Sequence, residues 1–110
     1  MNIELFEWRN IKVSNFSNVV RFCVKDGCEK DFEDLFDAFQ VNNGETNGYL
    51  INTNDKEYIY VGIWESEDAL VSSRAKMIED LDKMRDMLEE ISSDLGVTDP
   101  RSGNVVWSHS

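Results

Sequence analysis

Histidine, proline and cysteine are scarce in this sequence of 110 residues, which has one histidine, one proline and two cysteines. Two cysteines cannot form the dense disulfide framework of small secreted domains. One histidine leaves no Ser-His-Asp set and too few ligands for a structural zinc site. No apolar run approaches the roughly 20 residues that span a bilayer, and Met1–Arg9 lacks the basic start and continuous apolar stretch of a signal peptide. We therefore expect a cytoplasmic protein with no bound metal or other cofactor.

Basic residues are also few, because 11 lysines and arginines stand against 22 aspartates and glutamates. The net charge of -11 leaves no basic patch that could displace counterions from nucleic-acid phosphates. The same charge argues against docking on an anionic membrane surface. The hydrophobic fraction of 41% is enough for one core, so the sequence predicts a single domain that binds neither nucleic acid nor membrane.

The apolar patterns that are present predict strands and helices in the order β-α-β-β-α-β. Asn54-Asp55 suits the tight turn of a hairpin between the second and third strands. In the third strand one face carries Tyr58, Tyr60, Gly62 and Trp64. The four predicted strands are residues 18–25, 48–53, 57–64 and 104–108.

Two helices are predicted between these strands. The first begins at the N-cap Asp26, with Glu29 as its capping-box partner, and ends at Asn42-Asn43-Gly44. The second opens at the N-cap Ser66 and runs as one long helix to residue 95. The apolar stripe of the first helix is Cys28, Phe32, Leu35, Phe36 and Phe39. The second has an apolar seam with a spacing of about 3.5 residues, which also places Arg74 on the seam: Leu70, Met77, Leu81, Met84, Leu88, Ile91 and Leu95.

This order of elements predicts an α+β, ferredoxin-like βαββαβ fold, with an antiparallel sheet and both helices on one face. The other face would expose valines and isoleucines, which a soluble monomer rarely does, so we expect a homodimer that pairs two sheets face to face. The predicted domain is residues 18–110. Residues 1–17 do not fit its core pattern and are expected to form an N-terminal extension or an edge strand.

Two sequence blocks resemble the antibiotic biosynthesis monooxygenase (ABM) family. The first is Val20-Arg-Phe-Cys-Val-Lys-Asp-Gly-Cys-Glu-Lys-Asp-Phe32, a strand that leads through a turn into a phenylalanine-bearing helix. The second is Tyr60-Val-Gly-Ile-Trp-Glu-Ser-Glu-Asp-Ala-Leu70, a strand-to-helix junction centred on Trp-Glu-Ser. The resemblance implies a dimeric α/β barrel with a ligand pocket between the sheet and the helices of each subunit.

Some members of this family hydroxylate quinol-like aromatics without metal or flavin, and others degrade haem. The cofactor-free oxygenases resemble this sequence in the junction tryptophan, Trp64, but Tyr60-Val61 stands where they carry an Asn-Tyr pair. The positions that correspond to the functional residues of haem-degrading members carry other residue types, which disfavours haem degradation: Val20, Ser73 and Lys83.

The resemblance implies a small-molecule pocket protein, and from it we hypothesise a cofactor-independent monooxygenase that acts on an aromatic or quinol-like substrate. In that hypothesis Trp64 stacks on the substrate, Arg74 stabilises its anion and Tyr60 relays a proton. Four further side chains are expected to bind the small hydrophobic or aromatic ligand: Phe36, Tyr49, Tyr58 and Met77.

Two other functions stay open, and the sequence does not decide whether the protein is an enzyme. One is a non-catalytic ligand-binding or stress-type dimer, and the other is a dimerising module with a filled core. In the module, Trp64 is a core residue, the tyrosines pack on the sheet, and Arg74 extends its charged end to solvent. An open pocket with converging Arg74 and tyrosine side chains would favour ligand binding, whereas a sealed apolar interior would favour the module.

Overall fold

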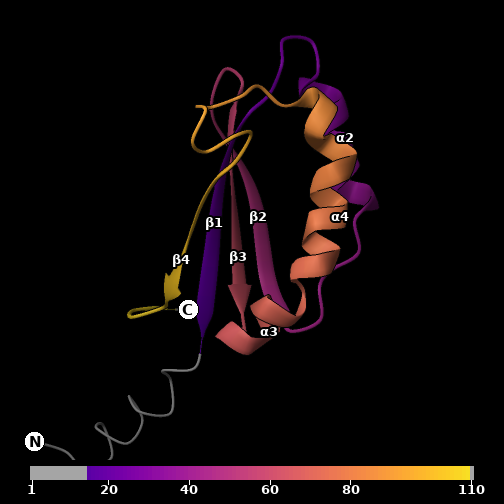
Figure 1. The fold of residues 1–110 in the computed structure, drawn as a ribbon. Coiled ribbons are helices and arrows are strands. Elements are labelled where there is room, and N and C mark those ends of the chain that lie inside the picture. Colours follow the sequence, from indigo (N-terminus) through magenta and orange to yellow (C-terminus); the bar gives the residue numbers. More distant parts are fainter. Residues whose placement is uncertain (1–14, 110) are drawn as a thin grey trace, which may run out of the picture.

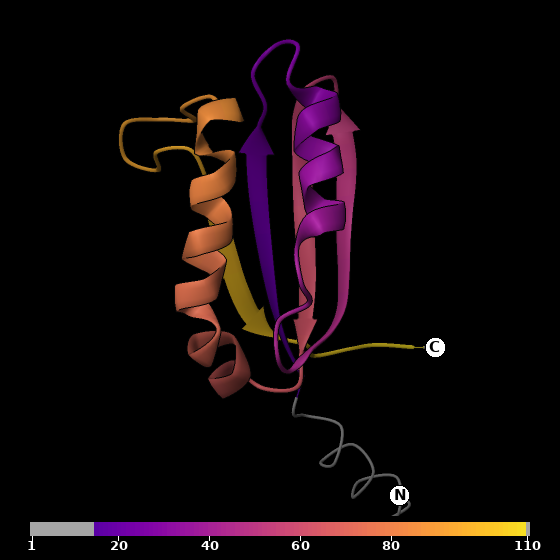
Figure 2. The same cartoon turned by 90° about the vertical axis from the view of Figure 1, so that its right-hand side faces the viewer.

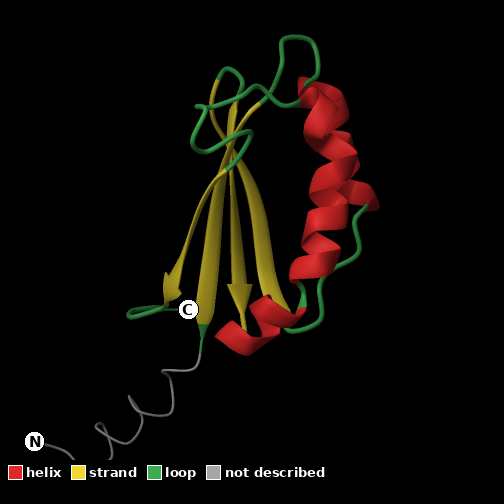
Figure 3. Cartoon of the chain, viewed as in Figure 1, coloured by secondary structure: helices red, strands yellow, loops and turns green. Residues whose placement is uncertain are grey.

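The fold is built on a four-stranded antiparallel sheet with the strand order β2-β3-β1-β4, in a computed structural model that describes residues 15–109. The strands are β1 (Phe16–Cys23), β2 (Glu45–Asn54), β3 (Glu57–Trp64) and β4 (Asp99–Asn104). The helices are α2 (Glu29–Ala38), α3 (Glu67–Ser72), α4 (Arg74–Met84) and the short 3-10 helix η1 (Arg85–Met87). Both α2 and α4 lie on one face of the sheet, which confirms the predicted βαββαβ arrangement (Figure 1, Figure 3).

The two longer helices cover different parts of this face. In Figure 2, α2 lies over the β3 and β2 side of the sheet, and α4 lies toward β1 and β4. The short helix α3 follows β3 directly and sits at that end of the sheet (Figure 1). Within residues 15–109, no helix is long and apolar enough to cross a membrane.

The first strand begins two residues earlier than predicted, at Phe16. Phe16 lies opposite Trp64 in the ladder between β1 and β3 and packs into the same buried cluster, so burial extends the strand at this end. At the other end Val24 leaves the sheet and forms an isolated bridge with Leu88. The predicted N-terminal extension or edge strand covers residues 1–17, of which residues 1–14 lie outside the described residues.

Helix α2 begins later than predicted. The N-cap is Cys28 and no side chain caps the helix, so the prediction of an Asp26 cap with Glu29 as partner is wrong. The backbone N–H of Cys28 instead donates to the Lys25 carbonyl at 3.0 Å, which closes a turn before the helix starts. The predicted apolar stripe is confirmed, because Phe32 is fully buried and the other stripe residues pack around the same core.

The segment predicted as one long helix is broken near its beginning. Ser66 Oγ accepts a hydrogen bond from the Ala69 N–H at 3.1 Å, which confirms the predicted cap of α3. The helix then breaks at the buried Ser73, whose N–H donates to the Leu70 carbonyl at 3.0 Å in a tight turn. Arg74 therefore starts a new helix, α4, and is exposed, so its predicted place on the buried seam is wrong.

The same segment also stops being helical much earlier than predicted. After η1, Leu88 has an extended backbone and is only 3% exposed, because it packs beside Val24 in the core. This long-range contact outweighs the helical spacing of the residues that follow. Leu95, predicted on the seam, is 39% exposed.

The last strand is Asp99–Asn104, and the prediction of residues 104–108 is wrong. It pairs with β1 at the edge of the sheet, where a proline such as Pro100 is tolerated. An ion pair between Arg21 and Asp99 at 3.3 Å joins the two residues that end this ladder. Trp107, in the segment favoured by strand propensity, is exposed beyond the strand.

Two buried clusters hold the helices to the sheet. The larger cluster is Phe22, Val24, Phe32, Tyr58, Met84 and Leu88. The smaller cluster is Phe16, Trp64 and Leu70. The candidate site adjoins the larger cluster, because Phe22 and Met84 also line it.

Candidate functional site

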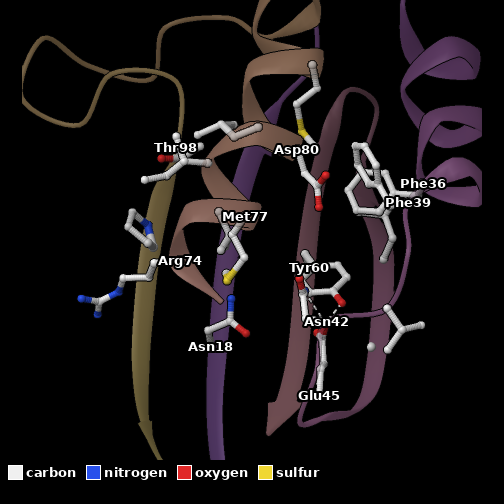
Figure 4. Close-up of a pocket in the computed structure, with 18 of the residues that line it drawn as sticks. Asn18, Phe36, Phe39, Asn42, Glu45, Tyr60, Arg74, Met77, Asp80 and Thr98 are labelled. Atoms are coloured by element: carbon white, nitrogen blue, oxygen red, sulfur yellow. Dashed lines mark hydrogen bonds between the residues drawn. The ribbon is translucent and has the colours of Figure 1, made fainter. Parts of the chain in front are cut away.

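A cavity of about 610 Å³ lies between the sheet and the helices α2 and α4. This volume falls within the usual range of small-molecule sites, and most of its wall is hydrophobic. Strands β1, β2 and β3, helices α2 and α4 and the segment after α2 all contribute side chains (Figure 4). Six apolar residues that line it are Val20, Phe22, Phe36, Leu50, Met77 and Leu81.

Four of the seven residues predicted for the site line this cavity, namely Phe36, Tyr60, Arg74 and Met77. The other three residues lie elsewhere. Tyr49 is 54% exposed on the opposite face of the sheet, because alternation along β2 turns Gly48 and Leu50 toward the cavity.

Tyr58 points toward the helices but lies under α2 and not in the cavity wall. Its ring packs against Phe32, with 4.9 Å between the ring centroids, and its hydroxyl donates to Glu33 at 2.5 Å. Burial first, and then this hydrogen bond, raise the pKa of Tyr58 to about 12. Tyr58 and Glu33 therefore form a tyrosine–carboxylate pair outside the cavity.

A second tyrosine–carboxylate pair lies within the cavity wall. The Tyr60 hydroxyl donates to Glu45 Oε2 at 2.6 Å, and Asn42 Nδ2 donates to Glu45 Oε1 at 2.8 Å (Figure 4). Burial, followed by the hydrogen bond to Glu45, raises the pKa of Tyr60 well above its usual value, so the phenol stays protonated. We call Asn42, Glu45 and Tyr60 the polar cluster.

Asn18 adds an amide to the same region of the wall. It is 6% exposed, and its Oδ1 accepts a hydrogen bond from Trp64 Nε1 at 2.7 Å. Because the indole can only donate, this bond fixes Nδ2 as the free end of the amide. Figure 4 shows that end directed toward Met77. Trp64 itself is 0% exposed and does not line the cavity, so it offers no open ring face there for a ligand to stack on.

Two glycines that lie opposite each other, Gly48 in β2 and Gly62 in β3, make room for these polar groups. A Cβ atom on Gly48 would collide with the Tyr60 hydroxyl. A Cβ atom on Gly62 would collide with Asn18 Oδ1 and would lie 2.6 Å from Glu45 Oε2. The bare backbone of this glycine pair is therefore what allows the tyrosine, the carboxylate and the amide to converge.

Arg74 lies at the edge of the cavity. Its side chain is exposed, and Figure 4 shows the guanidinium directed away from Tyr60 and Glu45. Asp80, the third charged group in the wall besides Glu45 and Arg74, is paired with Lys76 at 2.8 Å. In the described part of the chain, no group of three or more His, Cys, Asp or Glu side chains is placed to hold a metal ion.

Sequence reasoning did not select Asn18, Asn42 or Glu45. Asn18 was recognisable as a polar residue on the strand face that also carries Val20 and Phe22. In the sequence, Asn42 belongs to the helix-stopping run Asn42-Asn43-Gly44, and Glu45 precedes the predicted second strand. The bonds from Tyr60 to Glu45 and from Asn42 to Glu45 depend on the path of the chain after α2, for which the sequence carries no periodic signal.

No protein-family model matches the sequence, and no curated protein matches it. Solved structures do match its fold. A candidate antibiotic biosynthesis monooxygenase from Chloroflexus aurantiacus superposes with a TM-score of 0.69 over 88% of this chain and 98% of its own, at 9% identity. Another candidate antibiotic biosynthesis monooxygenase, from Bordetella bronchiseptica, gives a TM-score of 0.68 over 86% of this chain and 99% of its own, at 19% identity. A variant of SnoaB, a cofactor-independent oxygenase from Streptomyces nogalater, gives a TM-score of 0.63 over 88% of this chain and 96% of its own, at 18% identity.

These similarities define the class of fold. The chain has the ferredoxin-like α+β fold of antibiotic biosynthesis monooxygenase proteins, which confirms the fold class predicted from the order of the elements. At identities below 20% the likeness concerns the fold alone, so the chemistry has to be argued from the cavity.

Proposed function

We propose that this protein binds a small aromatic or quinol-like molecule in the cavity and oxygenates it with dioxygen, without a bound cofactor. The observation that carries the proposal is the polar cluster in a mostly apolar wall, where the Tyr60 hydroxyl lies 2.6 Å from Glu45 Oε2. The fold likeness to SnoaB, a cofactor-independent oxygenase, supports the same reaction class.

The cluster suits the removal of a proton from a phenolic hydroxyl. A substrate hydroxyl at Tyr60 would pass its proton to the Tyr60 oxygen while Tyr60 passes its own proton to Glu45. Asn18 Nδ2 would donate a hydrogen bond to the resulting anion. The apolar walls would keep water from the electron-rich ring.

The anion would then supply the electrons for oxygen reduction. One electron passes from the phenolate to dioxygen, and the two radicals combine at a ring carbon to form a C–O bond. The hydrogen on that carbon leaves as a proton while the O–O bond breaks. One oxygen atom stays as a ring carbonyl and the other leaves as water, so a phenol and dioxygen give a quinone and water.

Oxygen consumption with a panel of polycyclic phenols tests this function. We expect turnover in the unaltered protein and a loss of about 100-fold or more in Tyr60→Phe and Glu45→Gln, the scale of a lost acid–base group. The matched controls are Tyr58→Phe and Glu33→Gln, which alter the equivalent pair outside the cavity and should leave turnover unchanged. Equal turnover in all four variants, or none in the unaltered protein, would contradict the proposal.

The exposed position of Arg74 favours one alternative, a non-catalytic ligand-binding protein. No arginine or lysine of residues 15–109 forms an ion pair with the cluster that would stabilise a substrate anion inside the cavity. In this case the phenols bind with a measurable dissociation constant but no oxygen is consumed. The same assay, run beside a binding titration, separates the two functions.

We also propose that two copies pair through the sheet face that α2 and α4 leave uncovered. On this face Val19, Val61 and Tyr49 lie side by side across β1, β3 and β2, and Ile59 lies beside Ile51. Tyr49 and Ile51 are 54% and 46% exposed, so these residues form an open apolar patch on the face in the single chain. Burying it against a second copy removes that surface from water.

Light scattering should return about twice the chain mass of 12.7 kDa at micromolar concentration. Ile51→Lys should shift the mass toward 12.7 kDa, because the ammonium would have to be buried between two sheets. Val71→Lys is the matched control, since Val71 is also 46% exposed but lies on α3. A monomeric unaltered protein, or equal masses for both variants, would contradict the pairing.

A further inference from the structure

The charges around the cavity are arranged unevenly. Glu45 faces the cavity, and no ion pair among residues 15–109 includes it. Asp80 is paired with Lys76, and the guanidinium of Arg74 is directed away from the polar cluster (Figure 4). The chain as a whole carries a net charge of -11. The interior of the cavity is therefore electronegative at the end where its polar groups gather.

The hydrogen bonds of the cluster offset the charge of Glu45 only in part. Glu45 accepts from both Tyr60 and Asn42, and it has no proton donor of its own while ionised. Because Asn42 Nδ2 is committed to Glu45, the orientation of the amide is fixed. Its Oδ1 is buried and accepts no hydrogen bond from any described residue, so it adds a further uncompensated partial negative charge.

We propose that the cavity selects aromatic ligands whose polar head carries no negative charge and donates a hydrogen bond, with Glu45 as the residue that determines this specificity. An uncharged hydroxyl or amino group at the head meets the acceptors of the cluster. A carboxylate head at the same place would bring a second negative charge close to Glu45 in a poorly solvated wall. An Arg74 side chain inside the cavity would have produced the opposite preference, for an anionic ligand.

The inference rests on the cavity of the proposed function but concerns binding alone. A protein that shows the selectivity without consuming oxygen would contradict the oxygenase and leave the inference standing. A protein that consumes oxygen but binds carboxylates best would do the reverse.

Four pyrene probes of nearly equal shape test the selectivity: pyrene, 1-hydroxypyrene, 1-aminopyrene and 1-pyrenecarboxylate. Their fluorescence anisotropy is titrated with the full chain at pH 7. We expect 1-hydroxypyrene and 1-aminopyrene to bind more tightly than pyrene. The carboxylate should bind at least about tenfold more weakly than pyrene, as expected for two like charges in a partly desolvated site.

Glu45→Gln keeps the shape of the side chain and removes its charge. In this variant the affinity for 1-pyrenecarboxylate should rise about tenfold relative to the affinity for pyrene. The affinity for pyrene itself should change little. Glu33→Gln, in the pair outside the cavity, is the matched control and should leave all four affinities unchanged.

Three results would overturn the inference. The first is that 1-pyrenecarboxylate binds more tightly than 1-hydroxypyrene. If Arg74→Leu then loses that binding, Arg74 and not Glu45 determines the selectivity. The second is a selectivity that does not change in Glu45→Gln. The third is the absence of binding by all four probes, which would mean that the cavity does not accept aromatic bodies.

Discussion

Phe32→Ala should lower the free energy of unfolding by about 3–5 kcal/mol, which is a large part of the 5–15 kcal/mol of a typical domain. Phe32 is 0% exposed and is one of the three largest fully buried side chains among the described residues. Its ring packs edge-on against Phe22 and Phe36, at centroid distances of 5.5 and 5.2 Å, and tilted against Tyr58. Removing it opens a cavity where β1, β3 and α2 meet.

Phe36→Ala is the matched control, because Phe36 lies one helical turn away on the same helix but lines the cavity and is half-buried. We expect it to cost clearly less stability than Phe32→Ala and to weaken the binding of 1-hydroxypyrene. Urea unfolding of both variants at one protein concentration measures the difference. A loss in Phe32→Ala no larger than in Phe36→Ala would mean that the core is not centred on Phe32.

Local patterns were sufficient to predict the order of the elements and much of the inner face of the sheet. The third strand was predicted with the bounds that the structure shows, Glu57–Trp64, because a turn signal precedes it and a helix cap follows it. The stripe on α2 was predictable because its aromatic residues recur at helical spacing. These features depend on neighbours within a few residues in the chain.

The errors occur where distant contacts outweigh local preference. The spacing of the second helix continues through Ser73 and past Leu88, yet Ser73 is buried in a turn and Leu88 packs beside Val24 in an extended conformation. Strand propensity favoured the residues around Trp107, but pairing with β1 selected Asp99–Asn104. A one-dimensional pattern does not contain these choices, because each depends on where another element lies.

The same reason explains why the sequence predicted the cavity better than its chemistry. Phe36, Tyr60 and Met77 lie on patterned faces, and all three line the cavity. Glu45, the first residue of β2, reaches Tyr60, and Asn42, in the segment between α2 and β2, reaches Glu45. The cluster forms only because Gly48 and Gly62 leave the sheet bare beneath it. Trp64 lies beneath the wall and Arg74 lies at its edge, although the sequence predicts the leading roles for these two residues.

Trp64→Ala should also cost about 3–5 kcal/mol of unfolding free energy, because the side chain is 0% exposed and joins Phe16 to Leu70. Trp64→Phe removes the indole N–H together with a smaller part of the packing. It keeps an aromatic ring but leaves Asn18 Oδ1 buried without its donor, which should cost about 1–3 kcal/mol. The measurement is again urea unfolding, with Trp107→Phe, an exposed tryptophan, as the control that should lose almost nothing.

Affinity for 1-hydroxypyrene separates this structural role from the ligand-stacking role that the sequence suggested. If Trp64 supports the wall through Asn18, Trp64→Phe should lose stability. Asn18→Ala should then weaken ligand binding at least as much as Trp64→Phe does, because Asn18 lines the cavity and Trp64 does not. If Trp64 stacks on the ligand, Trp64→Phe should keep most of the stability. The affinity for 1-hydroxypyrene should then fall most strongly in Trp64→Ala and less in Asn18→Ala. The second pattern would require the indole to leave its buried position when a ligand binds, since none of its surface is accessible in the structure.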